Sequence, residues 1–233
     1  DLVLKQAFQH ALRPQAEALA REIADGGPAL LLPTPWAEDG KLYNAVLLLD
    51  GGAIAGKRFK VDLPNYGVFD EKRVFAAGPM PGPLVFRGVR LGVPICEDIW
   101  KPDVVECLAE TGAEMLIVPN GSPYELDKTD VRLHLAVERI AESGLPLIYV
   151  NQVGGNDQLV FDGASFAMDR EGREVASARS FEEDLVFFDS GAMTGDRRAN
   201  LADECEAVYE ALVLGTRDYI RKCGFSRVLI GLS

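Results

Sequence analysis

The chain has 233 residues, of which 48% are hydrophobic and 26% are charged, the balance of an ordinary globular protein. Its 24 Lys and Arg residues against 36 Asp and Glu residues give a formal net charge of −12. This acidity argues against nucleic-acid binding and against an electrostatic hold on anionic membranes, because both depend on basic side chains. The expected partner is therefore a small molecule or a protein.

Signals for a membrane, for secretion and for a metal site are missing from the sequence. The longest apolar runs, 29–32 and 45–49, are far shorter than the ~20 residues of a spanning helix. Residues 1–5 lack the basic start and cleavage site of a signal peptide. The four cysteines and two histidines show neither zinc-binding spacing nor a disulfide framework. We therefore expect a cytoplasmic protein with reduced thiols and no bound metal.

The first half of the chain predicts one helix followed by short strands. Apolar residues repeat on one face of a helix over 15–25, and Asp25-Gly26-Gly27-Pro28 ends it. Turn residues then separate short apolar runs, which predict two hairpins, one closed by Asp50-Gly51-Gly52 and one by Gly88. The expected strands are 29–32, 42–50, 54–60, 85–87 and 89–95.

Helical and strand patterns alternate in the second half. Helices are predicted at 103–111 and 131–143, and strands at 114–119, 147–150, 165–168, 174–178 and 184–188. Paired strands with helices between them predict an α/β sandwich in which helices cover sheets.

The C-terminal residues have a different texture. The Gly, Asp, Arg and Asn residues of 189–202 predict a linker, a helix follows over Glu204–Cys223, and Gly224 fits the position after it. Residues 228–231 then predict an apolar strand close to the last residue of the sequence. A strand in that place predicts the start of a second, truncated domain.

Cys96 is the first candidate for chemistry. It ends a buried-looking strand just before a helix begins, so its sulfur and the following backbone N–H groups point at one spot. A thiolate there could attack a carbonyl while the N–H groups hold the oxyanion. The acidic neighbours Glu97 and Asp98 oppose thiolate formation, so a cation from elsewhere is needed. From its position alone, Cys96 also fits a small buried hydrophobic residue without a chemical role. A papain-like Cys-His site is disfavoured, because neither His10 nor His134 sits in a catalytic loop pattern.

A second stretch, 57–71, contains Lys60 at a strand end and an irregular loop forced by Pro64-Asn65. From the residues alone, Lys60 also fits a strand-end lysine whose amine reaches water, and Tyr66 an ordinary loop aromatic.

Together these stretches resemble the carbon-nitrogen hydrolase (nitrilase) superfamily, and within it the glutaminase part of glutamine-dependent NAD synthetases. The resemblance covers nearly the whole chain in order. Its motifs are Lys60-x-x-Leu63-Pro64-Asn65-Tyr66-x-x-Phe69-Asp70-Glu71, Pro94-Ile95-Cys96-Glu97-Asp98-x-Trp100, Asn120-x-Ser122-Pro123, Tyr149-Val150-Asn151-Gln152-Val153-Gly154-Gly155, Phe161-Asp162-Gly163 with Ser165, and Cys205-Glu206-Ala207-Val208-Tyr209-Glu210-Ala211-Leu212.

The resemblance implies a four-layer αββα sandwich over 1–189, a linker over 190–203, and the first helix and strand of an ATP pyrophosphatase-type α/β domain over 204–233. It implies that Cys96 is the nucleophile that forms a thioester with glutamine and that Lys60 is the cation beside it. The Glu97 backbone N–H would hold the oxyanion. The matching glutamine-binding positions are Tyr66, Ser122 and Lys128, although Lys128 also fits a solvated charge before a helix.

The resemblance also implies parts outside this sequence. The family's catalytic Glu lies upstream of the segment that residues 1–5 resemble, and neither Glu71 nor Glu97 is expected to replace it. Residues 228–233 resemble the strand that enters the ATP loop, of which Ser233 would be the first residue. ATP, magnesium and deamido-NAD would therefore belong to the synthetase domain, and a homo-oligomer is expected by analogy.

Three other functions remain open from the sequence. A stand-alone nitrilase-type amidase or carbamoylase would need no helix at 204–223. A non-catalytic module would not need both Lys60 and Cys96 in their motifs. A redox role for Cys96 lacks a resolving cysteine nearby in the sequence.

Overall fold

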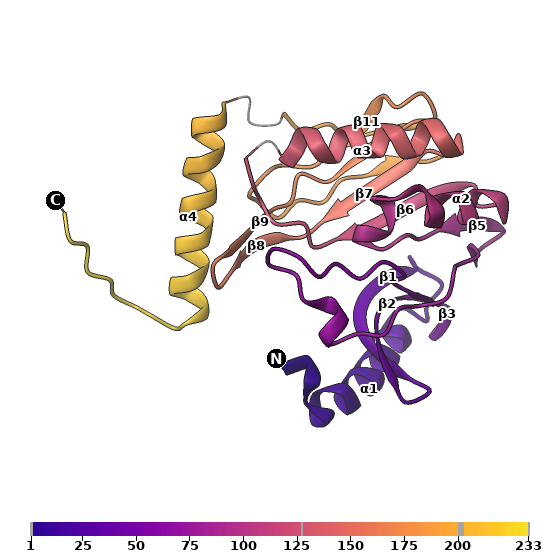
Figure 1. The fold of residues 1–233 in the computed structure, drawn as a ribbon, viewed down its shortest axis with the longest axis horizontal. Helices are drawn as coiled ribbons and strands as arrows, with labels where there is room; N and C mark the ends of the chain where they lie inside the picture. The colour runs from indigo at the N-terminus through magenta and orange to yellow at the C-terminus, as the bar shows by residue number, and fades with distance from the viewer. Residues whose placement is uncertain (1, 127, 200–202, 233) are drawn as a thin grey trace.

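Two β-sheets stack face to face between helices in the computed structural model, which describes residues 2–126, 128–199 and 203–232 (Figure 1). The helices are α1 (Gln6–Glu22), α2 (Pro102–Glu110), α3 (Lys128–Ser143) and α4 (Glu204–Lys222), with 3-10 turns at Leu2–Leu4, Glu71–Arg73 and Cys96–Ile99. The strands are β1 (Leu30–Glu38), β2 (Lys41–Asp50), β3 (Ala53–Phe59), β4 (Leu84–Phe86), β5 (Val89–Gly92), β6 (Met115–Asn120), β7 (Leu147–Asn151), β8 (Val153–Asn156), β9 (Leu159–Asp162), β10 (Phe166–Met168), β11 (Glu174–Ser177), β12 (Phe188–Asp189) and β13 (Thr194–Gly195).

The first sheet is the antiparallel meander β1-β2-β3, with α1 on its outer face (Figure 1). Successive side chains of a strand point to opposite faces. Leu47 of β2 accordingly packs against Ala16 and Ala20 of α1, whereas its neighbour Val46 packs against Val93 between the two sheets. Strand β2 is therefore buried on both faces, which explains its continuous apolar run.

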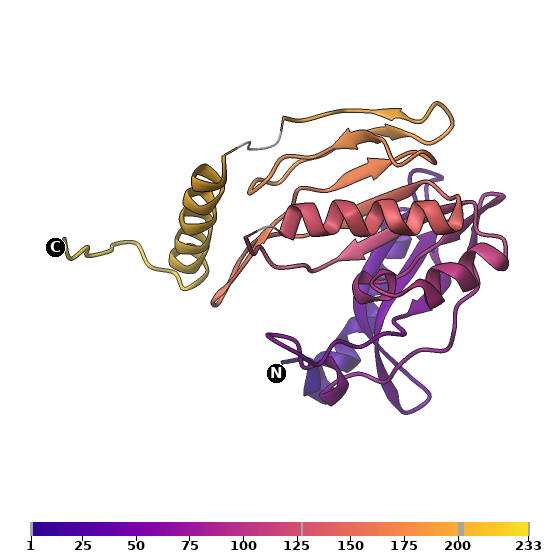
Figure 2. The same ribbon diagram turned by 45° about the horizontal axis from the view of Figure 1, so that its top comes forward.

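The second sheet has the order β11-β10-β7-β6-β5-β4, and its central strands β5, β6 and β7 are parallel. Helix α2 connects β5 to β6 and α3 connects β6 to β7, and both pack on the outer face of this sheet (Figure 2). The packing order is thus helix, sheet, sheet, helices. The carboxyl ends of the three parallel strands meet at one edge, which is where α/β sheets bind ligands.

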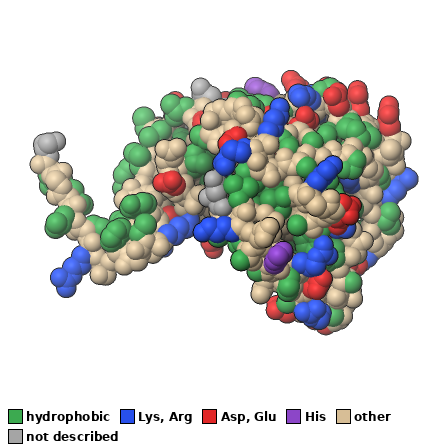
Figure 3. All heavy atoms as spheres, turned by 60° about the horizontal axis from the view of Figure 1, so that its bottom comes forward, with side chains coloured by type: hydrophobic (Ala, Val, Ile, Leu, Met, Phe, Trp, Pro, Cys, Tyr) green, Lys and Arg blue, Asp and Glu red, His purple; other side chains and the backbone are tan. Residues whose placement is uncertain are grey.

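Helix α4 lies beside the β8–β9 hairpin, away from the two sheets, and the residues after it extend outward (Figure 1). Ala211 and Leu214 of α4 are buried against Phe181. A Cβ on Gly155 of β8 would lie 2.9 Å from the Cα of Gly215, so glycine at both positions permits this close approach. Hydrophobic side chains also gather on the exposed surface of α4 and of the residues after it (Figure 3).

The mixed α/β fold and the two predicted hairpins are confirmed, as is the helix at Glu204–Lys222, although β5 is shorter than expected and β4 begins one residue earlier. Helix α1 begins at Gln6, nine residues before the expected start at residue 15. Pro14 lies inside the helix and removes one backbone N–H donor, but it does not end the helix. The predicted strand at 184–188 is reduced to Phe188–Asp189, and the expected linker contains β13.

The strand predicted at Val228–Gly231 is not formed. Leu229 is fully exposed, and no strand of the described residues pairs with this segment. An apolar run needs a hydrogen-bonding partner to become a strand. The described structure therefore does not show the predicted strand of a second α/β domain. No described helix is long and apolar enough to cross a bilayer.

Candidate active site

A cavity of about 380 Å³ opens at the carboxyl ends of the parallel strands. Its wall draws on both sheets: Lys60 follows β3 of the first sheet, and Cys96 follows β5 of the second. Asn120 and Asn151 end β6 and β7 on the same side. The remaining lining residues are Pro33, Asn44, Phe69, Glu71, Ile95, Pro119, Gly121, Val150 and Gln152.

Cys96 is the first residue of the 3-10 turn Cys96–Ile99 and has a positive φ of 48°. Backbone of this kind is uncommon for residues other than glycine and is found at functional sites. Burial raises the pKa of the Cys96 thiol, and the charge of Lys60 and a hydrogen bond from the Gly121 N–H oppose this rise. Lys60 is thus a cation close enough to Cys96 to act on its thiol.

Lys60 is 1% exposed and is held by an ion pair with Glu71. Its Nζ lies 2.7 Å from Glu71 Oε1, and Asn44 Nδ2 donates to the other oxygen of Glu71 at 3.4 Å. Glu71 therefore holds the Lys60 side chain in place at the cavity.

Tyr66 and Glu97 meet in a neighbouring hollow of about 680 Å³. The Tyr66 hydroxyl donates to Glu97 Oε1 at 2.8 Å, and burial together with Glu97 raises the pKa of Tyr66, which stays neutral. The Glu97 N–H lies in the first turn of the 3-10 helix, where N–H groups lack helical acceptors. The Glu97 N–H, which directly follows Cys96, therefore has no acceptor within its own helical turn.

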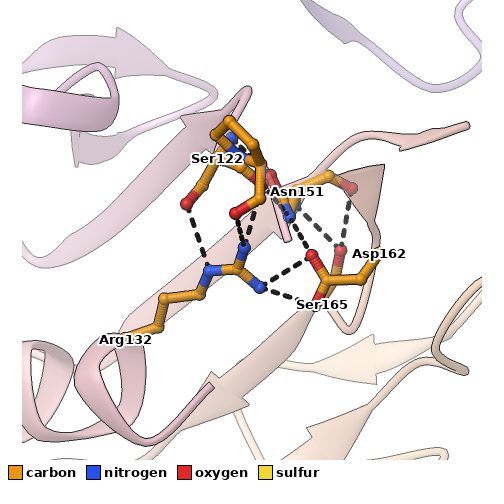
Figure 4. A network of polar contacts seen from close by, with 6 residues as sticks. Ser122, Arg132, Asn151, Asp162 and Ser165 are labelled. Carbon is orange, nitrogen blue, oxygen red and sulfur yellow. Dashed lines mark hydrogen bonds and ion pairs between the residues drawn. The ribbon is translucent and has the colours of Figure 1, made fainter. Parts of the chain in front are cut away.

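Ser122 belongs to a buried polar network with Arg132, Asn151 and Asp162 (Figure 4). Arg132 Nε donates to Ser122 Oγ at 3.2 Å and Arg132 Nη2 to its carbonyl at 2.9 Å. Arg132 Nη1 pairs with both oxygens of Asp162, at 2.9 and 2.7 Å. Asn151 Oδ1 accepts from the Ser122 N–H at 2.9 Å and so joins β7 to this loop. The lining of the cavity, among described residues, includes Gly121 but not Ser122.

Lys128 lies at the first residue of α3. Its Nζ is 3.3 Å from Glu125 Oε2 and 5.2 Å from the centre of the Trp100 ring. Glu125 also acts electrostatically on Tyr66, so these side chains face one region. Ser233 lies outside the described residues.

The structure thus places Cys96 and Lys60 in one cavity and Tyr66 and Glu97 in the adjoining hollow. Ser122 lies in the buried polar network around Arg132. Sequence reasoning missed the place of Glu71, and its only sequence signal was membership of the Lys60 motif. It also missed Arg132, because an arginine in the middle of a helix carries no local sign of burial.

This stacking of sheets, with a thiol and a buried ammonium at its strand ends, is the arrangement expected of carbon-nitrogen hydrolases. The model of the carbon-nitrogen hydrolase family matches residues 5–192. The chain belongs to this family.

Within this family, the chain is similar to glutamine-dependent NAD(+) synthetases over nearly its whole length. The glutamine-dependent NAD(+) synthetase of Rhodobacter capsulatus is 46% identical over 100% of this chain, which covers 43% of that protein. The structure of glutamine-dependent NAD+ synthetase from Acinetobacter baumannii, in complex with ADP, has a TM-score of 0.89 and 36% identity. It matches 98% of this chain and 44% of its own. The chain spans less than half the length of these synthetases.

An amidase from Nesterenkonia sp. AN1 is also similar, with a TM-score of 0.66 and 30% identity over 77% of this chain and 68% of its own. That structure shows the result of Michael addition of acrylamide at its active-site cysteine. The similarity to the synthetases therefore extends further along this chain than the similarity to the amidase.

Proposed function

We propose that this chain is the glutamine-hydrolysing part of a glutamine-dependent NAD synthetase. The observation that carries the proposal is the convergence of Cys96 and the buried Lys60 on one cavity, from two different sheets. The similarity to synthetases over the whole chain selects glutamine from among the amides that a carbon-nitrogen hydrolase could use.

In the proposed reaction, the Cys96 sulfur gives up its proton to a base and attacks the side-chain carboxamide of glutamine. A carbon–sulfur bond forms, the carbon–nitrogen bond breaks, and the nitrogen leaves as ammonia with a proton from that base. Water then attacks the thioester and releases glutamate and the thiol. The family resemblance assigns the base to a glutamate outside these residues, while the ion pair with Glu71 would hold Lys60 in place.

Two groups of this chain would stabilise the tetrahedral intermediate. The Lys60 ammonium and the Glu97 N–H lie beside the thiol, where the carbonyl oxygen of glutamine becomes negative. Fixed donors of this kind lower the barrier because they need no reorganisation during the reaction.

Substrate binding is proposed for Tyr66, Ser122 and Lys128. The α-carboxylate of glutamine would pair with Lys128, and its α-ammonium would meet the carboxylates that already face Tyr66 and Lys128, those of Glu97 and Glu125. Ser122 would contribute through the loop that Arg132 holds in place.

The ammonia would pass to a synthetase domain that amidates deamido-NAD with ATP and magnesium. Helix α4 and the residues after it would belong to the start of that ATP pyrophosphatase-type domain, and Ser233 to its ATP loop. A cytoplasmic homo-oligomer is part of the same proposal.

The test is Cys96→Ala in the polypeptide that carries both activities. The variant should lose glutamine-dependent NAD formation and keep formation from added ammonia. Equal loss of both would make Cys96 structural. Hydrolysis of simple amides with no preference for glutamine would instead favour a stand-alone amidase.

A further inference from the structure

Asp98 is a fully buried carboxylate whose bonds connect the two sheets. Its Oδ1 accepts the N–H groups of Val61 at 3.0 Å and Asp62 at 2.8 Å, both of which follow β3. Its Oδ2 accepts the N–H of Ile95 at 2.9 Å, which follows β5. One side chain therefore binds backbone from both halves of the sandwich.

The bonded N–H groups flank the two residues that face the cavity. Val61 and Asp62 come directly after Lys60, and Ile95 comes directly before Cys96. Each oxygen thus holds one of the two backbones on which the ammonium and the thiol depend. Charged acceptors bind N–H groups about twice as strongly as neutral ones, so this bridge is stiff.

We infer that Asp98 is a positioning residue that sets the distance between Lys60 and Cys96 by holding the backbone beside each of them. The inference rests on the proposed function for its catalytic meaning, but the geometry itself concerns only the reactivity of the thiol. Asp98 touches neither the cavity nor, by this inference, the substrate.

The negative charge of Asp98 and its positioning of the backbone would have opposite effects on the reactivity of the Cys96 thiol. Arg58 and Lys60 are the cations that act on Asp98, and its pKa of about 6 leaves it ionised at neutral pH. Removing a negative charge near the thiol would by itself favour the thiolate and speed its reactions. Loosening the Lys60–Cys96 geometry would withdraw the cation and slow them. The two roles therefore predict opposite signs.

The test is Asp98→Asn, which keeps the shape but replaces one acceptor oxygen with a donor amide. Alkylation of Cys96 by iodoacetamide is followed by mass spectrometry between pH 6 and 10, with the exposed Cys205 of the same protein as reference. Asp169→Asn is the matched control, because buried Asp169 also accepts two backbone N–H groups, those of Glu171 and Arg173, away from the cavity.

The positioning role predicts that Asp98→Asn slows Cys96 alkylation about tenfold at pH 8 and moves its pH profile up by about one unit. The control should leave both unchanged, whatever its effect on unfolding by urea. Unchanged or faster alkylation in Asp98→Asn would overturn the inference. Wild-type protein that does not hydrolyse glutamine, while Asp98→Asn still slows alkylation, would reject the proposed function and keep the positioning role.

Discussion

Replacing Arg132 by Met should destabilise the protein more than any surface change. Arg132 is 3% exposed, and its guanidinium donates to both oxygens of Asp162 and to the carbonyls of Ser122 and Pro123 (Figure 4). Methionine fills a similar length without charge. The variant therefore leaves the Asp162 carboxylate buried and without its cation.

The size of the loss follows from this burial. Asp162 is 2% exposed, and its other side-chain donor, Asn151 Nδ2, lies at 3.5 Å, too far to replace the arginine. Removing one partner of a buried pair costs about 3–5 kcal/mol, because the remaining charge is uncompensated. Adding Asp162→Asn to Arg132→Met should recover part of this loss, since the stranded charge is then gone.

Unfolding by urea measures these free energies, and the two single variants with the double variant form a thermodynamic cycle. Arg179→Met is the control, since Arg179 also pairs with a carboxylate, that of Glu182, but both side chains of this pair are exposed, at 58% and 61%. Its loss should stay below about 1 kcal/mol. If Arg132→Met lost no more than this control, the argument from burial would be wrong.

Three further changes test the site. Lys60→Met should slow ammonia release from glutamine by about 100-fold or more, because the cation that acts on the thiol is removed; a near-normal rate would exclude Lys60 from the reaction. Tyr66→Ala should raise KM for glutamine about tenfold with little change in kcat, and an unchanged KM would contradict a binding role. Because burial raises the pKa of Asp98 from 3.8 to about 6, its folded form holds a proton that the unfolded form loses, and stability falls as pH rises through 6. The wild-type unfolding free energy should thus fall by about 2 kcal/mol relative to Asp98→Asn between pH 4 and pH 7, and urea titrations showing no such difference would refute the shift.

The sequence predicted best those elements whose signals are local. The β2–β3 hairpin has a continuous apolar run and a glycine turn, so its strands were placed to within two residues. The β8–β9 hairpin was missed, because Gly154 and Gly155 weaken a strand pattern. Those glycines serve contact with α4, a helix some 50 residues away in sequence, and no local pattern can report such a contact.

The candidate site divides in the same way. Cys96 was predictable from a strand followed by a helical turn, and the structure adds its positive φ. Glu71 could not be placed from spacing, because the loop after Lys60 folds back and forms a 3-10 turn before its carboxylate reaches the ammonium. Ser122 was predicted as a glutamine-binding position from the resemblance alone, and the structure adds that its hydroxyl accepts a hydrogen bond from Arg132.

The distance between thiol and ammonium depends on packing far from either residue. Lys60 follows strand β3 of the first sheet and Cys96 follows strand β5 of the second, so neither sheet alone contains the site. Val46 and Val93 are fully buried between the sheets and set their separation, while the Asp98 carboxylate fixes their relative shift at the strand ends. A close-packed interior transmits a lost methyl group as a movement of the surrounding backbone. The core between the sheets therefore helps to set how Lys60 and Cys96 face each other across the cavity.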